Sequence, residues 1–105
     1  MRRRPTLRLP SRLRCAVRQV DDVRLVEVSG ELSGRTRRRL QDLVFDLAAD
    51  DAGPVVVDLA GLDYYDMDSL EGLLGAQRLV KWGRHCPVTL RGLEAATDRL
   101  MARAG

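Results

Sequence analysis

Hydrophobic and polar positions in four segments of the chain follow patterns that are typical of β-strands. Residues 13–19 alternate weakly, which predicts a half-exposed strand near the edge of a sheet. Residues 23–29 alternate clearly, and Gly30 is expected to end this strand. Residues 55–59 are almost continuously β-branched, which is typical of a central strand covered on both faces. Residues 87–91 alternate again and predict a fourth strand.

Helical periodicity fills the segments between these strands. Residues 34–49 and 69–83 each carry apolar side chains three and four positions apart, and a last helix is predicted after Gly92. The side chains expected to face inward are Leu40, Leu43, Val44, Leu47, Ala48, Leu70, Leu73, Leu74, Leu79, Val80, Leu93, Ala96, Leu100, Met101 and Ala104. The order β-β-α-β-α-β-α predicts an α/β fold with a mixed, largely parallel four-stranded sheet and three helices.

The composition favours one globular domain. The chain has 105 residues, of which 45% are hydrophobic and 31% charged, enough for one two-layer core. No apolar run approaches the roughly 18 residues that a membrane span needs, and no apolar stretch follows the basic start as in a signal peptide. We therefore predict a cytoplasmic protein.

The net charge of +3 hides two regions of opposite sign. Six arginines and no acid lie in residues 1–14, which leaves 12 basic and 15 acidic side chains in the rest. Residues 1–11 are predicted to be a basic, unstructured arm, and residues 12–105 a single domain. The arm is interpreted either as a solvated tail or as an arm for nucleic acid or an acidic partner. It has no aromatic residue, which weakens single-strand binding as an interpretation.

A second basic cluster lies in the first turn of the helix predicted over residues 34–49. Arg35, Arg37, Arg38 and Arg39 occupy positions where the helix dipole favours acids. Two interpretations remain open for this cluster, a solvated helix face and an acid-binding patch.

Few residues carry the chemistry of enzymes or metal sites. Cys15 and Cys86 lack metal-ligand spacing, and His85 is the only histidine, so we predict reduced thiols, no metal and no cofactor. The sequence has no glycine-rich phosphate loop and no cysteine–histidine nucleophile pattern. Asp66 and Asp68 could be paired carboxylates for acid–base catalysis, but adjacent loop acids are usually solvated or cap helices.

The hexapeptide Tyr64-Tyr65-Asp66-Met67-Asp68-Ser69 lies just past the carboxyl end of the predicted central strand. In open α/β sheets, ligands and partners usually bind at this end. Asp68 is predicted to cap the following helix, with Glu71 three residues later completing a capping box. A cap is the structural interpretation of Asp68, and it does not exclude a function.

Three motifs in register resemble those of one family. Val28-Ser29-Gly30-Glu31-Leu32 is similar to V-x-G-E-(L/I)-D, and residues 55–62 are similar to V-V-L-D-(L/F)-S-x-(V/L). Residues 66–74 are similar to D-S-S-G-L-x-x-L-L. Over residues 12–104 the chain therefore resembles the STAS domain of anti-sigma factor antagonists, and the order of predicted elements agrees with that of the family.

The resemblance implies a phosphorylation switch with one essential residue changed. In the family, a partner anti-sigma factor that is also a serine kinase phosphorylates the second serine of D-S-S-G, which disrupts their interface. The resemblance places Asp66 at the leading aspartate, Met67 at the first serine, Asp68 at the phosphoacceptor and Ser69 at the glycine. Asp68 has no hydroxyl, so it either imitates a phosphate or meets a partner that accepts an acid. Ser69 could be an acceptor in a different register.

The predicted function is a non-enzymatic protein-interaction regulator. Its expected partner is an anti-sigma factor kinase. The alternatives are a larger complex, such as a transporter ATPase or stress-signalling assembly, and nucleic acid bound by the basic arm. The residues expected to contact a partner are Tyr64, Tyr65, Asp66, Met67, Asp68, Ser69, Leu70, Glu71, Leu74 and Arg78.

Overall fold

A four-stranded sheet with three helices forms the described part of the protein. The structure is a computed structural model that describes residues 13–50, 53–84 and 86–104. Its elements are β1 (Leu13–Val20), β2 (Val23–Leu32), α1 (Arg37–Ala49), β3 (Val55–Tyr65), α2 (Met67–Arg84), β4 (Val88–Arg91) and α3 (Leu93–Ala104). This order confirms the predicted β-β-α-β-α-β-α arrangement. The basic arm predicted for residues 1–11 lies outside the described residues.

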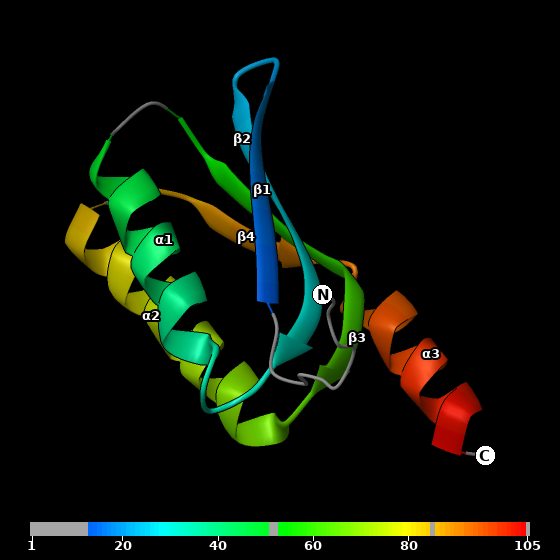
Figure 1. Ribbon diagram of the computed structural model, residues 1–105. Helices are drawn as coiled ribbons and strands as arrows, with labels where there is room; N and C mark the ends of the chain where they lie inside the picture. Colours follow the sequence, from blue (N-terminus) through cyan, green and yellow to red (C-terminus); the bar gives the residue numbers. More distant parts are fainter. Residues whose placement is uncertain (1–12, 51–52, 85, 105) are drawn as a thin grey trace, which may run out of the picture.

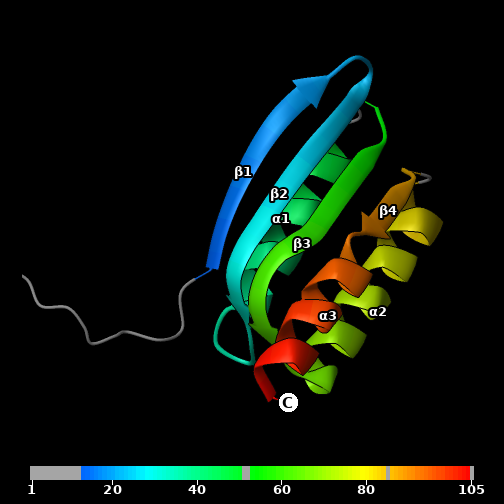
Figure 2. The ribbon, with the colours of Figure 1, turned by 90° about the vertical axis from the view of Figure 1, so that its right-hand side faces the viewer.

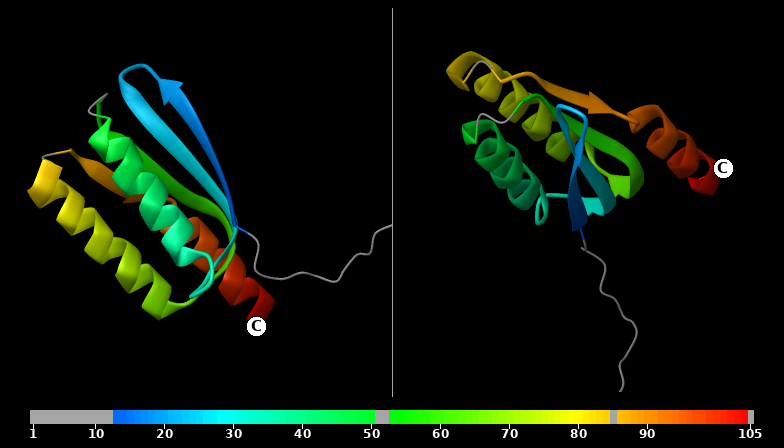
Figure 3. Two further views of the ribbon diagram at one scale, coloured as in Figure 1. Left: turned by 60° about the vertical axis from the view of Figure 1, so that its left-hand side comes forward. Right: turned by 90° about the horizontal axis from the view of Figure 1, so that it is seen from above.

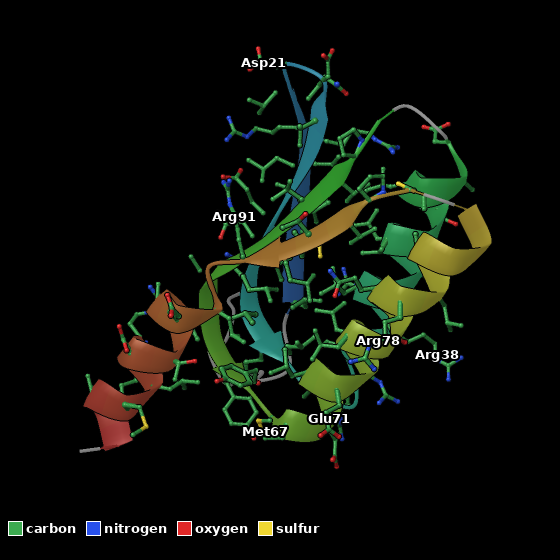
Figure 4. The ribbon with its side chains drawn as sticks, turned by 180° about the vertical axis from the view of Figure 1, so that it is seen from behind. Asp21, Arg38, Met67, Glu71, Arg78 and Arg91 are labelled. Carbon is green, nitrogen blue, oxygen red and sulfur yellow. The ribbon has the colours of Figure 1, made fainter. Side chains whose placement is uncertain are left out.

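The strands lie side by side in chain order, β1-β2-β3-β4, as Figure 2 shows. β1 and β2 form an antiparallel hairpin, whereas β2–β3 and β3–β4 are parallel pairs. Asp21 has a φ of 54° in the hairpin turn, where Figure 4 labels it. The prediction of a mixed, largely parallel sheet is therefore confirmed.

The helices cover the two faces of the sheet unequally. α1 and α2 lie next to each other on one face, and α3 packs on β3 from the other face (Figures 1 and 3). The buried core lies mainly between the sheet and the α1–α2 layer, because β2 and β3 direct Val26, Val28, Val57 and Leu59 to that side. No helix among the described residues is long and apolar enough to cross a membrane.

Two strands extend further than predicted. β2 continues through Gly30, which has a φ of 94°, to Leu32, and β3 continues to Tyr65. The prediction that Gly30 ends its strand is wrong, because Glu31 and Leu32 pair with Tyr64 and Tyr65 after a shift in register. Glycine tolerates the positive φ that this irregular pairing requires.

Two side chains predicted to face inward lie at the surface. Leu79 is 64% exposed and Met101 is 68% exposed. The buried stripe of α2 instead runs through Leu73, Ala76 and Val80, which turns Leu79 toward the outer side of the helix layer. In α3 the stripe is narrow, and Ala96 is its fully buried member.

A buried arginine fixes the end of the sheet opposite to the hexapeptide. Arg24 is 5% exposed, and its guanidinium donates to the carbonyl oxygens of Leu47, at 2.5 Å, and Gly53, at 2.6 Å. Leu47 lies in the last turn of α1, at the negative end of the helix dipole, where a cation is favourable, and its carbonyl oxygen also accepts from the backbone N–H of Asp50 at 3.2 Å. Arg24 therefore holds the end of α1 against β2.

Candidate functional site

The candidate site lies where the carboxyl ends of β2 and β3 meet the first turns of α1 and α2. Leu13, at the start of β1, pairs with Gly30, so this strand also begins at the same end of the sheet. The backbone N–H of Asp66 donates to the carbonyl oxygen of Leu32 at 3.3 Å, which joins the end of β2 to the start of α2. The parallel topology therefore brings the family-like motifs of residues 28–32 and 66–74 together.

Asp66 caps α2. Its Oδ1 accepts a hydrogen bond from the backbone N–H of Ser69 at 2.8 Å, and its carbonyl oxygen accepts one from Leu70 at 3.1 Å. The hydrogen bond from the Ser69 N–H stabilises the carboxylate and lowers the pKa of Asp66. The prediction that Asp68 is the cap of a capping box with Glu71 is wrong, because α2 begins at Met67 and Asp68 lies within its first turn.

The first turn of α1 is held by contacts with other elements. Thr36 is 3% exposed, and its Oγ1 donates to the carbonyl oxygen of Glu31 at 2.7 Å and accepts from the backbone N–H of Ser33 at 3.0 Å. Thr36 makes no side-chain cap hydrogen bond to α1, and the first turn contains no acid. Arg39 reaches β1 and donates from Nη1 to the carbonyl oxygen of Leu13 at 3.2 Å.

α1 and α2 are joined close to these first turns. Gln41 donates from Nε2 to the carbonyl oxygen of Gly72 at 2.8 Å. Arg37 lies against the same glycine, since a Cβ at Gly72 would be 2.7 Å from its Cδ. Arg37 also contributes a favourable charge near Asp66. These contacts explain two arginines of the unusual first turn, Arg37 and Arg39, by packing and hydrogen bonding, while Arg35 and Arg38 are exposed.

Only part of the predicted partner-binding set reaches the surface. Tyr64 is 45% exposed and Met67 is 60% exposed, and Asp68, Glu71 and Arg78 are exposed as well. Figure 4 shows Met67 and Glu71 at the start of α2. We call Tyr64, Met67, Asp68 and Glu71 the site surface.

The other predicted partner-binding residues are structural in this fold. Ser69 is 1% exposed and Leu70 is 7% exposed, while Leu74 is half-buried. Tyr65 is half-buried, and its hydroxyl lies 2.7 Å from Oγ1 of Thr97, which ties β3 to α3. Of the residues predicted to bind a partner, those that face outward at the start of α2 are therefore two large apolar side chains and two acids.

The remaining chemistry of the described residues is modest. Within residues 13–50, 53–84 and 86–104, no three metal-ligating side chains gather in one place. Both cysteines are free thiols, and burial raises the pKa of the Cys15 thiol, with Arg39 opposing the shift. Asp66 uses one carboxylate oxygen in its cap, which distinguishes its role from that of the exposed Asp68.

A groove of about 500 Å³ lies on the outer side of the α1–α2 layer, and sequence reasoning missed it. It is lined by Gln41, Phe45, Gly72, Gly75, Ala76, Arg78 and Leu79. Of the two glycines in its lining, Gly72 faces α1 and Gly75 faces open space. A signal was present, since Gly72, Gly75 and Leu79 recur at helical spacing on a stripe separate from the core stripe.

Comparisons with known proteins agree with this architecture. A family model described as "Mlab, STAS domain" matches residues 15–105. An anti-sigma factor antagonist from Mycobacterium paratuberculosis has a TM-score of 0.67 and 26% identity, over 94% of this chain and 83% of that one. An antisigma-factor antagonist STAS domain from Rhodobacter sphaeroides has a TM-score of 0.67 and 20% identity, over 86% and 97%.

The chain is also similar to a third anti-sigma factor antagonist, at lower sequence identity. The anti-sigma factor antagonist SpoIIAA in its unphosphorylated form has a TM-score of 0.57 and 14% identity, over 73% of this chain and 71% of that one. At this identity the likeness concerns the fold alone. The comparison with curated proteins gives no match.

Proposed function

The chain belongs to the STAS domain family, and from this premise we propose that it is a non-enzymatic regulator that binds a partner protein through the site surface. Its fold is that of anti-sigma factor antagonists. An anti-sigma factor with serine kinase activity is therefore the first partner class to test. Location in the cytoplasm stays a prediction.

The observation that carries the proposal is the exposure of Tyr64 and Met67 at the carboxyl end of the sheet. The hydration of exposed apolar side chains is unfavourable. Burying them against a partner would stabilise the complex by about 25 cal/mol per Å² of apolar surface removed from water. Asp68 and Glu71 beside them supply charges that favour a basic partner rim. Aromatic and methionine side chains are enriched at the centres of protein interfaces.

The position of the hydroxyl groups supports regulation without phosphorylation in the first turn of α2. The motif resemblance puts Asp68 at the family's acceptor position, and Ser69 is buried while its backbone N–H donates to Asp66. A kinase would have to open the first turn of α2 to reach Ser69. We therefore propose that Asp68 is a fixed negative charge that stands in for a phosphoserine and weakens, without abolishing, binding to such a kinase.

The same observation favours a second candidate function. A STAS domain without an accessible acceptor suits a permanent subunit of a larger complex, such as a transporter ATPase or a stress-signalling assembly. In that case the site surface would contact its partner constantly, and Asp68 would meet a cationic side chain rather than imitate a switched state.

Binding can be tested with two methionines of similar exposure. Met67→Ala should weaken binding to a purified anti-sigma factor kinase about tenfold, because the truncation removes an apolar contact worth about 1–2 kcal/mol. Met101→Ala is the matched control, since Met101 is 68% exposed and belongs to α3 rather than to the site surface. Isothermal titration calorimetry with the full chain measures both. Equal affinity for the two variants and the unchanged protein would contradict the proposed surface.

The role of Asp68 needs a separate substitution. If Asp68 imitates a phosphate, Asp68→Ser should bind the kinase more tightly and become phosphorylated in the presence of ATP, as mass spectrometry would detect. If the serine variant and the unchanged protein bind equally and neither is phosphorylated, the phosphate-mimic hypothesis is wrong. A complex that contains the unchanged protein but excludes Asp68→Ser would support the permanent-subunit function.

A further inference from the structure

A glycine in the middle of α2 has no explanation within the described fold. A Cβ at Gly75 would meet nothing within 4 Å, whereas a Cβ at Gly72 would meet Arg37 and Gln41. Glycine in a helix interior costs about 1 kcal/mol relative to alanine. Packing between α1 and α2 therefore accounts for Gly72 but leaves Gly75 as an unfavourable residue on the outer surface of the groove.

Exposed apolar side chains stand on both walls of this groove. Leu79 of α2 is 64% exposed, and Phe45 of α1 is 38% exposed. Between them, Gly72 and Gly75 leave room for a side chain or for the close approach of another backbone. The groove is thus shaped like the hole into which a large side chain of a neighbouring helix packs.

On each helix, one acidic and one basic side chain lie on opposite sides of the centre of the groove. On α2, Glu71 lies four residues before Gly75 and Arg78 three residues after it. On α1, Arg38 and Asp46 lie four residues on either side of Asp42. Glu71, Arg78, Arg38 and Asp46 are all exposed, and none forms an ion pair with another described residue. Figure 4 shows Arg38, Glu71 and Arg78 along the helix layer.

We propose that the outer face of the α1–α2 layer binds the same face of a second copy of this chain, with the helices antiparallel. A twofold axis near Gly75 places Glu71 of each copy opposite Arg78 of the other. The hydrogen bond from Gln41 to Gly72 aligns the two helices, so the same axis passes near Asp42. Arg38 of each copy then lies opposite Asp46 of the other.

The same arrangement accounts for the apolar surface. Leu79 of each copy enters the groove of the other beside Gly72, and the missing Cβ at Gly75 lets the two α2 helices approach closely. One contact opposes association, because Asp42 of the two copies approach each other across the axis. With 13 residues, α1 is about 20 Å long, so the interface is at the small end of stable sizes. The expected dimer is therefore weak, with a dissociation constant of about 10–100 µM.

This inference goes beyond the proposed function, although Glu71 and Arg78 belong both to this face and to the predicted partner contacts. Self-association covers Glu71, so a dimer and a complex with a partner at the site surface would compete. Tyr64→Ala separates the two ideas, since Tyr64 belongs to the site surface but lies at the end of β3, outside the face proposed for self-association. Loss of partner binding with an unchanged dimer, or the reverse, shows which proposal fails.

The experiment is sedimentation equilibrium of the full chain from about 1 µM to about 1 mM. Glu71→Arg and Arg78→Glu should each weaken the dimer at least about tenfold, because each places like charges opposite one another twice. The double variant Glu71→Arg with Arg78→Glu should restore the dissociation constant to within about threefold of the unchanged protein. Only a self-complementary contact is restored in this way.

Gly75→Leu supplies a test that does not depend on charge. Its side chain starts in open space, so the fold should remain stable in thermal unfolding while the dimer is lost. Ala95→Leu is the matched control, because Ala95 is an exposed alanine of α3. A chain that stays monomeric throughout the concentration range, or a double variant that associates no better than the single ones, overturns the proposal.

Discussion

The first turns of α1 and α2 lie at the same end of the sheet but are stabilised in different ways. α1 has arginines and no acid in its first turn, and Thr36 makes no cap hydrogen bond to the helix. Its start is held by Thr36 and Arg39, which bond to carbonyl oxygens outside α1. α2 starts with Asp66, which caps the helix through a single local hydrogen bond, and with Asp68 in its first turn.

The difference shows how one end of a sheet can serve both stability and binding. Residues that hold α1 are committed to contacts inside the protein, so Thr36 is buried and Arg37 lies against α2. The local cap of α2 leaves the neighbouring Met67, Asp68 and Glu71 exposed. A first turn that is capped locally can therefore present side chains to a partner without weakening the core.

The largest expected effect is on the start of α1. Thr36→Val keeps the shape of the side chain but removes the hydroxyl that bonds the backbone groups of Glu31 and Ser33, leaving both partly buried residues without this partner. The free energy of unfolding should fall by about 2–3 kcal/mol in urea denaturation. Thr89→Val, at an exposed position of β4, should change it by less than about 0.5 kcal/mol. Similar effects of the two variants would show that Thr36 does not hold α1.

A smaller effect is expected at the start of α2, and it should depend on pH. Asp66→Ala removes the cap and should lower the free energy of unfolding by about 1 kcal/mol at neutral pH. Because the folded protein lowers the pKa of Asp66, this stabilisation is present above the unfolded pKa of about 4 and is lost as pH falls through the folded value. Unfolding measured from pH 7 to about pH 2 should show the two proteins converge.

The control for this prediction is the neighbouring acid. Asp68→Ala changes an exposed carboxylate of the same turn for which no hydrogen bond is observed among the described residues, so its effect should be smaller. A difference between Asp66→Ala and the unchanged protein that stays constant down to about pH 2 would mean that the carboxylate charge does not contribute to the cap.

The smallest effect tests the arginines before α1. Arg35→Glu replaces an exposed cation with an anion next to the positive end of the helix dipole, which should stabilise the protein by a few tenths of a kcal/mol. Thermal unfolding at low salt measures the gain, and about 1 M NaCl should remove it by screening. Destabilisation by Arg35→Glu would indicate that the side chain of Arg35 makes a stabilising contact in the folded protein.

The sequence predicted the arrangement of elements well because apolar periodicity follows burial directly. Leu40, Val44 and Ala48 of α1 are buried as expected. Val55 and Val57 of the central strand β3 are buried in the hydrophobic core. Element ends were less predictable. β2 and β3 continue past Gly30 and Gly61 because they pair with each other there. The residues near the end of one strand do not reveal this pairing, since the partner strand is distant in the sequence.

At the candidate site, residue types were easier to predict than their roles. Asp66 and Asp68 are two residues apart and both suit a helix start, so the choice of cap depends on where β3 ends. Leu79 fits an apolar stripe on α2 but lies on its outer side, because the groove beside α1 is not distinguishable from the core by hydrophobicity alone. Only the structure shows that the side chain of Leu79 is exposed to solvent.

The strand order β1-β2-β3-β4 also bears on how the protein is made. Each strand pairs with the one synthesised immediately before it, so the sheet can grow at a single edge while the chain leaves the ribosome. No strand has to insert between two others that have already paired. The newest strand is the exposed edge at every stage, and α3, synthesised after all four strands, packs on β3 once the neighbours of β3 are in place.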